Sequence, residues 1–293
     1  VSVIYDPDDK AIEIVSVMPD SPAEEFGLLV GDIIVGVGIG DNAESVAALG
    51  YNIAISKIRG KEGTNAEFVI LRDGEYIDCS VTRAKITEQT VLSRVYSLDE
   101  SVGVIRITSF DKKTFAQFKA AVEGLKELGC TSLVVDVRNN PGGELGAICD
   151  VLDFLLPEGP IIRTVDKSGK EEIVATSDSE YLGMPMSIVV NGSTASAAEL
   201  FTSAMMDYEL ATVVGTKTFG KGCMQTIGYF PDGSGYRITY RLYNPPFSDN
   251  YDGIGIEPDV NVELNPDLDK VNPFKYTDEQ DNQLAAAVAA LKQ

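Results

Sequence analysis

The sequence contains no histidine among its 293 residues. Without histidine the chain cannot form a Ser-His-Asp triad or a Cys-His pair, and it lacks the commonest metal ligand in proteins. A hydrolase built from this chain therefore needs another base. The remaining candidates are lysine, aspartate, glutamate or an N-terminal amine.

Basic side chains are scarce relative to acidic ones. The chain has 24 Lys and Arg against 45 Asp and Glu, which gives a formal net charge of −21. Nucleic-acid binding needs clusters of Lys and Arg that neutralise phosphates, so we expect no nucleic-acid partner. A solvated acidic surface that aids solubility explains the charge, and the acidity alone names no partner.

Cysteine is also sparse, and its spacing excludes several kinds of site. The four cysteines include no CxxC pair, which argues against zinc, and they are too few for a disulfide scaffold. We expect free thiols, no metal and no cofactor, although one disulfide stays open. The cysteines are Cys79, Cys130, Cys149 and Cys223.

Long apolar runs are missing as well. No run approaches the ~20 residues that cross a bilayer, so the sequence predicts a soluble protein, and its length allows about two domains. The chain starts at Val1 rather than methionine, which suggests processing or trimming. A signal peptide or membrane anchor would then lie outside these residues.

Residues 1–84 predict a compact β-rich module. Alternating apolar residues indicate a hairpin around a turn at 6–9, and Asp73-Gly74 is typical of a second hairpin. Ser21 and Pro22 begin a short helix, which Gly27 ends. We expect strands at 1–5 and 11–15, a turn and strand at 31–37, a helix near 51–58, and strands at 66–71 and 76–81.

Beyond a connector at 85–102, which has few strong signals, strands alternate with helices. This alternation predicts a sheet covered by helices, so the fold class is α/β (α+β). We expect strands at 103–107, 132–137, 187–190 and 211–215, hairpin-like strands within 163–182, and helices at 112–128, 144–156 and 197–206. An Ala-rich helix ends near Leu291, and packing or contact with a second copy are equally open roles for it.

Three loops in this α/β region invite both a structural and a chemical interpretation. Ser196 follows an apolar strand and precedes a helix, where a helix cap is the common role and a nucleophile beside free N–H groups is the alternative. Gly142-Gly143 is either a turn or a loop that presents N–H groups to an oxyanion. Lys221, between two glycines, is either a solvated surface residue or a desolvated base, with Gln225 four residues on to orient it.

Five phrases of the α/β region stand out, at 103–110, 136–143, 195–199, 215–225 and 253–259. In this order they resemble the carboxyl-terminal processing, or tail-specific, proteases of serine peptidase family S41. In front of them, residues 21–34 and 58–64 resemble a bacterial PDZ domain, whose carboxylate-binding loop is missing or cut by the chain start.

The resemblance implies specific roles for residues in these phrases. It implies that Ser196, rather than Ser193, is the nucleophile, that Lys221 is its base, and that Gln225 supports the lysine. The oxyanion donors would be the N–H groups of Ala197 and Gly143. The chain departs from the family at Thr194 and Ala198, where serines are common, and at 242–251, which replaces a Thr-Pro-containing segment.

The resemblance also implies the architecture and the biology. It implies a PDZ-like domain at 1–84, a crotonase/ClpP-like α/β protease core at 85–266 and a helical tail at 267–293. The function would be cleavage of proteins recognised by accessible C-terminal tails, gated by the PDZ module, outside the cytoplasm, in a bacterial envelope, periplasm or secreted form or a thylakoid lumen. A membrane anchor beyond these residues and a homodimer stay open. The alternatives are a non-catalytic PDZ scaffold on a lapsed protease core, and acyl transfer or hydrolysis of a non-peptide substrate.

Overall fold

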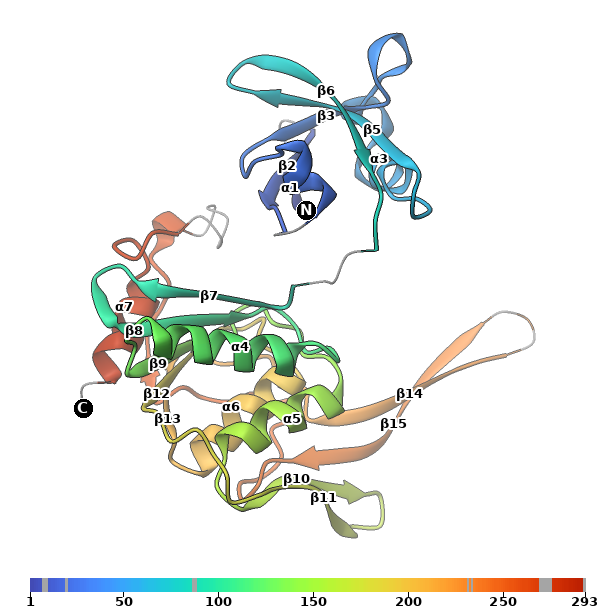
Figure 1. Cartoon of the computed structure of the whole chain (residues 1–293). Helices are drawn as coiled ribbons and strands as arrows, with labels where there is room; N and C mark the ends of the chain where they lie inside the picture. Colours follow the sequence, from blue (N-terminus) through green and yellow to red (C-terminus); the bar gives the residue numbers. More distant parts are fainter. Residues whose placement is uncertain are drawn as a thin grey trace. The chain divides into compact units, whose positions relative to one another are not determined.

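The computed structural model describes residues 1–6, 10–18, 21–85, 89–230, 232, 234–268 and 276–291. The chain divides into two compact units, Val1–Glu88 and Gln89–Gln293, coloured blue to cyan and green to red in Figure 1. Each unit has its own buried apolar core. None of the helices in the described ranges is long and apolar enough to pass through a bilayer.

The first unit is an antiparallel sheet with short helices. Its strand order is β1-β2-β3-β5-β6, and β4 pairs with β3. Ser21 Oγ accepts the Glu24 N–H at 3.3 Å, and Gly27 ends the first helix in the left-handed region with φ of 86°. The elements are β1 (Ser2–Asp6), β2 (Ala11–Ser16), α1 (Pro22–Phe26), β3 (Ile33–Val37), η1 (Gly40–Asn42), β4 (Glu44–Ser45), α2 (Val46–Leu49), α3 (Tyr51–Ile58), β5 (Asn65–Arg72) and β6 (Glu75–Thr82).

Both predicted hairpins of this unit are confirmed. β1 pairs with β2, and β5 pairs with β6 from Asn65↔Thr82 to Arg72↔Glu75. Asp73 and Gly74 between the latter have φ of 51° and 84°, as a two-residue hairpin turn requires. The predicted turn at 6–9 lies mostly outside the described residues.

The second unit is built on a six-stranded sheet of order β16-β13-β12-β9-β8-β7. Every neighbouring pair is parallel except β7 and β8. The carboxyl ends of the parallel strands therefore lie at one edge of the sheet. The strands are β7 (Val91–Tyr96), β8 (Asp99–Ile107), β9 (Ser132–Asp136), β12 (Met186–Val190), β13 (Ala211–Gly215) and β16 (Val260–Asn261).

Helices cover both faces of this sheet, which explains why its central strands β9 and β12 are buried at nearly every position. Leu133 and Ile188 belong to the larger core, with α4 (Thr114–Glu127), α5 (Leu145–Leu155) and α6 (Ala197–Asp207). Val134 and Val189 point to the opposite face, where they pack with α7 (Asn282–Ala290). The predicted terminal helix is thus α7, and packing on the sheet is one role it has.

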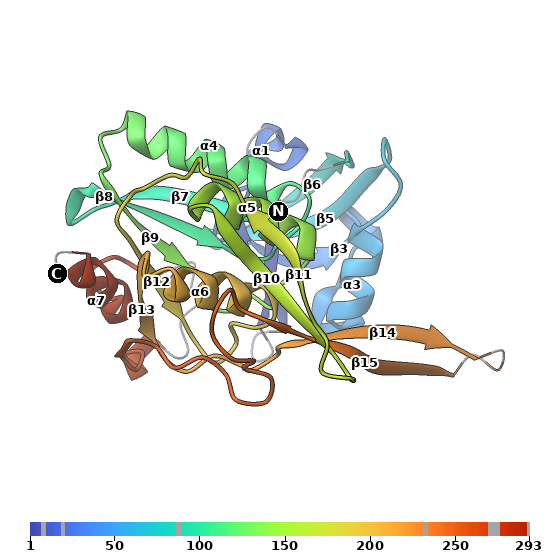
Figure 2. The same ribbon diagram turned by 90° about the horizontal axis from the view of Figure 1, so that it is seen from below.

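A second, four-stranded antiparallel sheet completes the unit, in the order β11-β10-β15-β14. Its β14–β15 hairpin extends away from the body of the unit in Figures 1 and 2. The strands β10 and β11 confirm the hairpin predicted within 163–182, whereas the sequence analysis assigned no strands to β14 and β15. The strands are β10 (Gly159–Asp166), β11 (Glu171–Ser177), β14 (Cys223–Tyr229) and β15 (Gly235–Asn244).

The prediction of a connector at 85–102 is wrong from Val91 onward. β7 and the first residues of β8 lie there, joined by a tight turn at Ser97-Leu98. β7 is the edge strand of the sheet, and Ser93 and Arg94 in its middle are exposed. An edge strand with polar side chains gives a weak apolar pattern, because its pairing with β8 is settled by tertiary structure.

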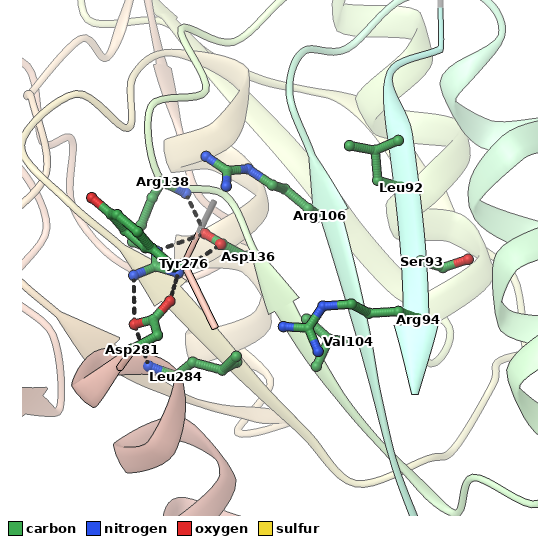
Figure 3. A pocket seen from close by; sticks show the side chains of 10 residues that line it. All are labelled: Leu92, Ser93, Arg94, Val104, Arg106, Asp136, Arg138, Tyr276, Asp281 and Leu284. Atoms are coloured by element: carbon green, nitrogen blue, oxygen red, sulfur yellow. Dashed lines mark hydrogen bonds and ion pairs between the residues drawn. The ribbon is translucent and has the colours of Figure 1, made fainter. Parts of the chain in front are cut away.

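A buried ion cluster joins the end of β9 to the start of α7. The Arg138 guanidinium donates to Asp136 Oδ2 at 2.8 Å and to Asp281 Oδ2 at 2.6 Å, and all three side chains are buried. Figure 3 shows this cluster beside a cavity of about 190 Å³ that Arg94 and Arg106 also line. Burial raises the pKa of Asp136, but the Arg138 and Arg106 charges outweigh it and hold that pKa below its usual value. The cluster anchors the strand end from which the Gly142-Gly143 loop begins.

Candidate active site

Three loops meet at the carboxyl edge of the parallel strands. They follow β9, β12 and β13, and they carry Gly143, Ser196 and Lys221 respectively. A cavity of about 540 Å³ lies where they meet, and all five residues singled out from the sequence line it. Its lining residues are Gly143, Leu145, Ser196, Ala197, Leu200, Lys221, Cys223, Met224, Gln225, Ile227, Arg237, Tyr240 and Tyr243.

Ser196 occupies a strained turn between β12 and α6. Its φ of 58° and ψ of −119° are unusual for a residue with a side chain. Such strain persists only where the surroundings hold it, and it is common at functional sites. Two hydrogen bonds hold this turn: the Ala195 N–H donates to Asn140 O at 2.9 Å, and the Ser196 N–H donates to Glu199 Oε2 at 2.9 Å.

The glycine loop approaches this turn so closely that side chains are excluded. A Cβ on Gly142 would lie 2.7 Å from Ser196 Cβ and 2.8 Å from Ala197 N. A Cβ on Gly143 would lie 1.9 Å from Phe110 O, and its φ is 154°. Both glycines are therefore required by the close packing of the loop against its neighbours.

The backbone N–H groups of Ala197 and Gly143, both at the cavity, have no acceptor among the described residues. Phe110 N donates to Gly142 O and Glu144 N donates to Phe110 O, which is the pattern of a parallel bridge between Phe110 and Gly143. In such a bridge the N–H of Gly143 itself points away from Phe110. Ala197 is the first residue of α6, where N–H groups lack partners within the helix.

Glu199 ties the serine turn to the lysine loop. Its side chain is fully buried and accepts four hydrogen bonds. Oε2 accepts the N–H groups of Ser196 and Lys221 at 2.9 and 2.8 Å, and Oε1 accepts Gly220 N–H and Thr218 Oγ1–H, both at 2.6 Å. Sequence reasoning gave Glu199 no role, although a glutamate three residues after a serine at a helix start is a known capping signal.

Tyr243 is a second residue that the sequence analysis missed. Its hydroxyl donates to the backbone oxygen of Lys221 and lies within hydrogen-bond distance of Ser196 Oγ, at 3.4 Å. Burial raises the pKa of Tyr243 to about 12, so the hydroxyl stays a donor at neutral pH. No sequence signal points to it, because it comes from β15 and reaches the site only through the second sheet.

The two predicted partners of Ser196 are near it but not bonded to it. Within the described residues the Lys221 ammonium makes no ion pair or hydrogen bond, and Ser196 Oγ is contacted by Tyr243 instead. Gln225 donates its Nε2–H to Thr239 Oγ1 at 3.2 Å rather than contacting the lysine. The structure thus brings Ser196, Lys221 and Gln225 to one cavity without a hydrogen bond between them.

The site holds no group of metal ligands. Among the described residues, no three His, Cys, Asp or Glu side chains are placed to hold a metal ion. The four cysteines are free thiols. Burial raises the pKa of Cys223, the one that lines the cavity, so its thiol is in the protonated, weakly nucleophilic form at neutral pH.

A β-rich unit precedes an α/β core with a serine on a strained strand-to-helix turn, beside free N–H groups. This combination is typical of serine hydrolases, in which a strained strand-to-helix turn places the serine beside backbone N–H donors. Residues 101–262 match peptidase family S41, and residues 13–39 match the PDZ domain family. The chain belongs to peptidase family S41.

Known proteins are similar to the chain over most of its length. A protein named probable CtpA-like serine protease, from Staphylococcus haemolyticus, is 35% identical over 87% of this chain and 50% of its own. A protein named carboxyl-terminal-processing protease, from Synechocystis, is 33% identical over 88% of this chain and 60% of its own. The chain thus spans about half the length of the curated relatives it matches.

Solved structures agree with this fold. The photosystem II D1 C-terminal processing protease is 28% identical, with a TM-score of 0.55 over 90% of this chain and 71% of that one. A putative S41 protease from Bacteroides fragilis has a TM-score of 0.63 over 99% of this chain and 81% of that one. At 16% identity the latter shows the fold alone.

Proposed function

We propose that the chain is a serine endopeptidase in which Ser196 and Lys221 form the catalytic dyad. The observation that carries this proposal is that one cavity is lined by residues from three separate loops, the start of α6 and the β14 strand. These residues are Gly143, Ser196, Ala197, Lys221 and Gln225. Membership of family S41 supports the same assignment.

The proposed reaction begins with attack of Ser196 Oγ on a peptide carbonyl. Lys221 Nζ, in its neutral form, takes the serine proton and later gives it to the leaving amine. The tetrahedral oxyanion is stabilised by the N–H groups of Ala197 and Gly143, which have no acceptor within the described residues. Water, activated by the same lysine, then hydrolyses the acyl-enzyme and restores Ser196.

One rearrangement must precede this step. Ser196 Oγ is hydrogen-bonded to the Tyr243 hydroxyl, and Lys221 Nζ makes no hydrogen bond to it. Catalytic hydrogen bonds are often long or unformed in a free enzyme and tighten when substrate binds. We infer that substrate brings Lys221 Nζ into reach of Ser196 Oγ, while Gln225 releases its Nε2–H hydrogen bond to Thr239 and turns its amide oxygen toward the lysine.

The substrates we propose are proteins with accessible C-terminal tails, as the names of the relatives suggest. The PDZ-like domain at 1–84 would bind such tails and control access to the core at 85–266. The helical segment 267–293 would follow the core in the sequence. The PDZ match supports a peptide-binding role for the first unit. By the same analogy the protein would act outside the cytoplasm. A homodimer and a membrane anchor beyond these residues remain predictions.

The test is cleavage of an unfolded protein and of a tailed peptide by the chain and its Ser196→Ala and Lys221→Ala variants. We expect both variants to lose at least about 1,000-fold in kcat, because each removes one reacting group. Ser193→Ala is the matched control, since Ser193 is exposed and does not line the cavity. Unchanged cleavage in either dyad variant overturns the assignment.

The competing proposal is a non-catalytic peptide-binding scaffold, which the missing Ser196–Lys221 hydrogen bond favours. A fluorophosphonate that labels a serine nucleophile separates the two. Labelling of the chain, lost in Ser196→Ala, supports the peptidase. A chain that is never labelled, with or without a tail peptide and between pH 6 and 10, supports the scaffold.

A further inference from the structure

The Ser196 cavity has an unusual charge for this chain. Two of its lining residues, Lys221 and Arg237, have basic side chains, and none of the lining residues described is acidic. The whole sequence, by contrast, has almost twice as many acidic as basic residues and a net charge of −21. The cavity is therefore a locally basic site on an acidic protein.

Arg237 is placed toward the cavity by the register of the β14–β15 hairpin. Gln225 and Ile227 are two residues apart on β14, so their side chains share one face of the strand. Arg237 on β15 is directly opposite Ile227, which places it on the same face. All three residues line the cavity, so the hairpin forms its wall.

The guanidinium of Arg237 is not neutralised within the protein as described. It has no ion pair or hydrogen bond there, whereas the two other arginines of the same sheet are paired, Arg163 with Glu171 and Arg241 with Glu172. A planar guanidinium with free N–H groups is suited to bind a carboxylate through two parallel hydrogen bonds. Its position in the cavity makes substrate the natural source of that carboxylate.

We propose that Arg237 binds a carboxylate of the substrate and selects substrates that carry one near the cleaved bond. This inference rests on the proposed peptidase function. The carboxylate belongs either to an Asp or Glu side chain or to the end of the substrate chain. It must pair with Arg237 rather than Lys221, because an anion beside the lysine would favour the charged ammonium and weaken the base.

The hairpin also limits where the carboxylate lies. The β14 strand spans roughly 13 Å from Cys223 at its start to Ile227, which is opposite Arg237, at about 3.3 Å per residue. An extended substrate peptide has the same rise per residue. We therefore expect the carboxylate within about four residues of the scissile bond. Leu145, Leu200 and Met224 also line the cavity, and their apolar side chains favour apolar substrate residues near the bond itself.

The experiment uses one apolar peptide with a single Asp at each of four positions on either side of its centre. Matched Asn peptides, all amidated, serve as controls, and one Asn peptide ends in a free carboxylate to separate terminal from side-chain recognition. We expect one Asp offset or the free terminus to raise kcat/KM about 2- to 5-fold, as an ion pair to the exposed Arg237 allows. Arg237→Gln should remove this preference and Arg237→Glu should reverse it. Lys119→Gln, an exposed charge on α4, should leave it unchanged.

A binding measurement separates this inference from the proposed function. Fluorescence anisotropy of labelled Asp and Asn peptides is measured with Ser196→Ala, alone and combined with Arg237→Gln. A preference for the carboxylate that Arg237→Gln abolishes supports the subsite even if no peptide is cleaved, in which case the peptidase proposal fails alone. Cleavage or binding with no preference for a carboxylate, or a preference that survives Arg237→Gln, overturns the subsite and leaves the peptidase proposal standing.

Discussion

Glu199 Oε2 accepts the backbone N–H of Lys221 at 2.8 Å, although 22 positions separate the two residues. The same oxygen accepts the N–H of Ser196, so one buried carboxylate fixes both loops of the proposed dyad. The interaction acts on the backbone and leaves both reacting side chains free. We therefore expect the Glu199 carboxylate to position the proposed dyad without taking part in proton transfer.

Glu199→Ala should lower both stability and activity. It leaves several buried N–H groups without an acceptor, which costs about 3 kcal/mol or more of unfolding free energy. Displacement of Ser196 and Lys221 by even about 1 Å should slow fluorophosphonate labelling roughly 100-fold. Urea unfolding and labelling rates measure the two effects.

Glu199→Gln keeps one acceptor oxygen, so its stability and labelling rate should lie between those of Glu199→Ala and the unchanged chain. Glu123→Gln, on the exposed face of α4, is the control. Labelling of Glu199→Ala at the normal rate would refute the positioning role.

Tyr243 predicts a loss of stability at alkaline pH. Burial raises its pKa from 10.0 in the unfolded chain to about 12, so between these values the folded state holds a proton that the unfolded state releases. The resulting contribution to the free energy of unfolding is about 2–3 kcal/mol. It is fully present below pH 10 and is lost as the pH rises toward 12. Tyr243→Phe should be less stable than the unchanged chain at pH 9, by about 1 kcal/mol, because it loses the hydroxyl hydrogen bonds.

The difference in free energy of unfolding between the unchanged chain and Tyr243→Phe should therefore shrink and then change sign above pH 10. Urea unfolding at pH 9, 10, 11 and 12 measures it. Tyr229→Phe is the control, because Tyr229 is 78% exposed on the same hairpin. A constant difference between Tyr243→Phe and the unchanged chain across this range would contradict the assigned pKa.

Local sequence signals predicted the elements that carry the site. Continuous apolar runs gave β9, β12 and β13, because each is buried on both faces. The Ser21 cap and the Asp73-Gly74 turn fixed two boundaries in the first unit through their own backbone chemistry. The five residues singled out for the site also line one cavity, since they follow strands that end at the same sheet edge.

The sequence could not provide the contacts that depend on tertiary structure. Tyr243 meets Ser196 only because β15 pairs with both β10 and β14. The β14–β15 hairpin has exposed side chains on both faces, so it lacks the alternation that indicates a half-buried strand. Arg237 looks like any surface arginine until the register places it opposite Ile227.

The Asp136–Arg138–Asp281 cluster predicts how the core responds to acid. Arg138→Met removes the cation that pairs with both buried carboxylates, which should cost about 3–5 kcal/mol at pH 7. In the unchanged chain the folded-state pKa of Asp136 lies below its unfolded value of 3.8. The ionised Asp136 therefore adds to the free energy of unfolding above pH 3.8, and this stabilisation is lost as the pH falls through the folded-state pKa. In the variant, burial without Arg138 favours the protonated acid.

Lowering the pH should therefore reduce the difference in free energy of unfolding between the unchanged chain and Arg138→Met. Urea unfolding at pH 7, 5 and 4 measures it, with the exposed Lys126→Gln as a control for charge removal. A gap that stays constant or widens toward pH 4 would show that Arg138 contributes through packing rather than charge.

The glycine loop gives the sharpest test of the oxyanion assignment. Gly143→Ala places a Cβ 1.9 Å from the backbone oxygen of Phe110, so the loop must move and carry its N–H away from the cavity. We expect kcat to fall about 100-fold or more, as when one oxyanion donor is lost, with a smaller change in KM. Gly146→Ala is the matched control, because a Cβ there meets nothing within 4 Å and the residue lies within α5. That variant should keep full activity and gain up to about 1 kcal/mol of stability from helix propensity. Equal activity in the two variants would exclude the Gly143 N–H as an oxyanion donor.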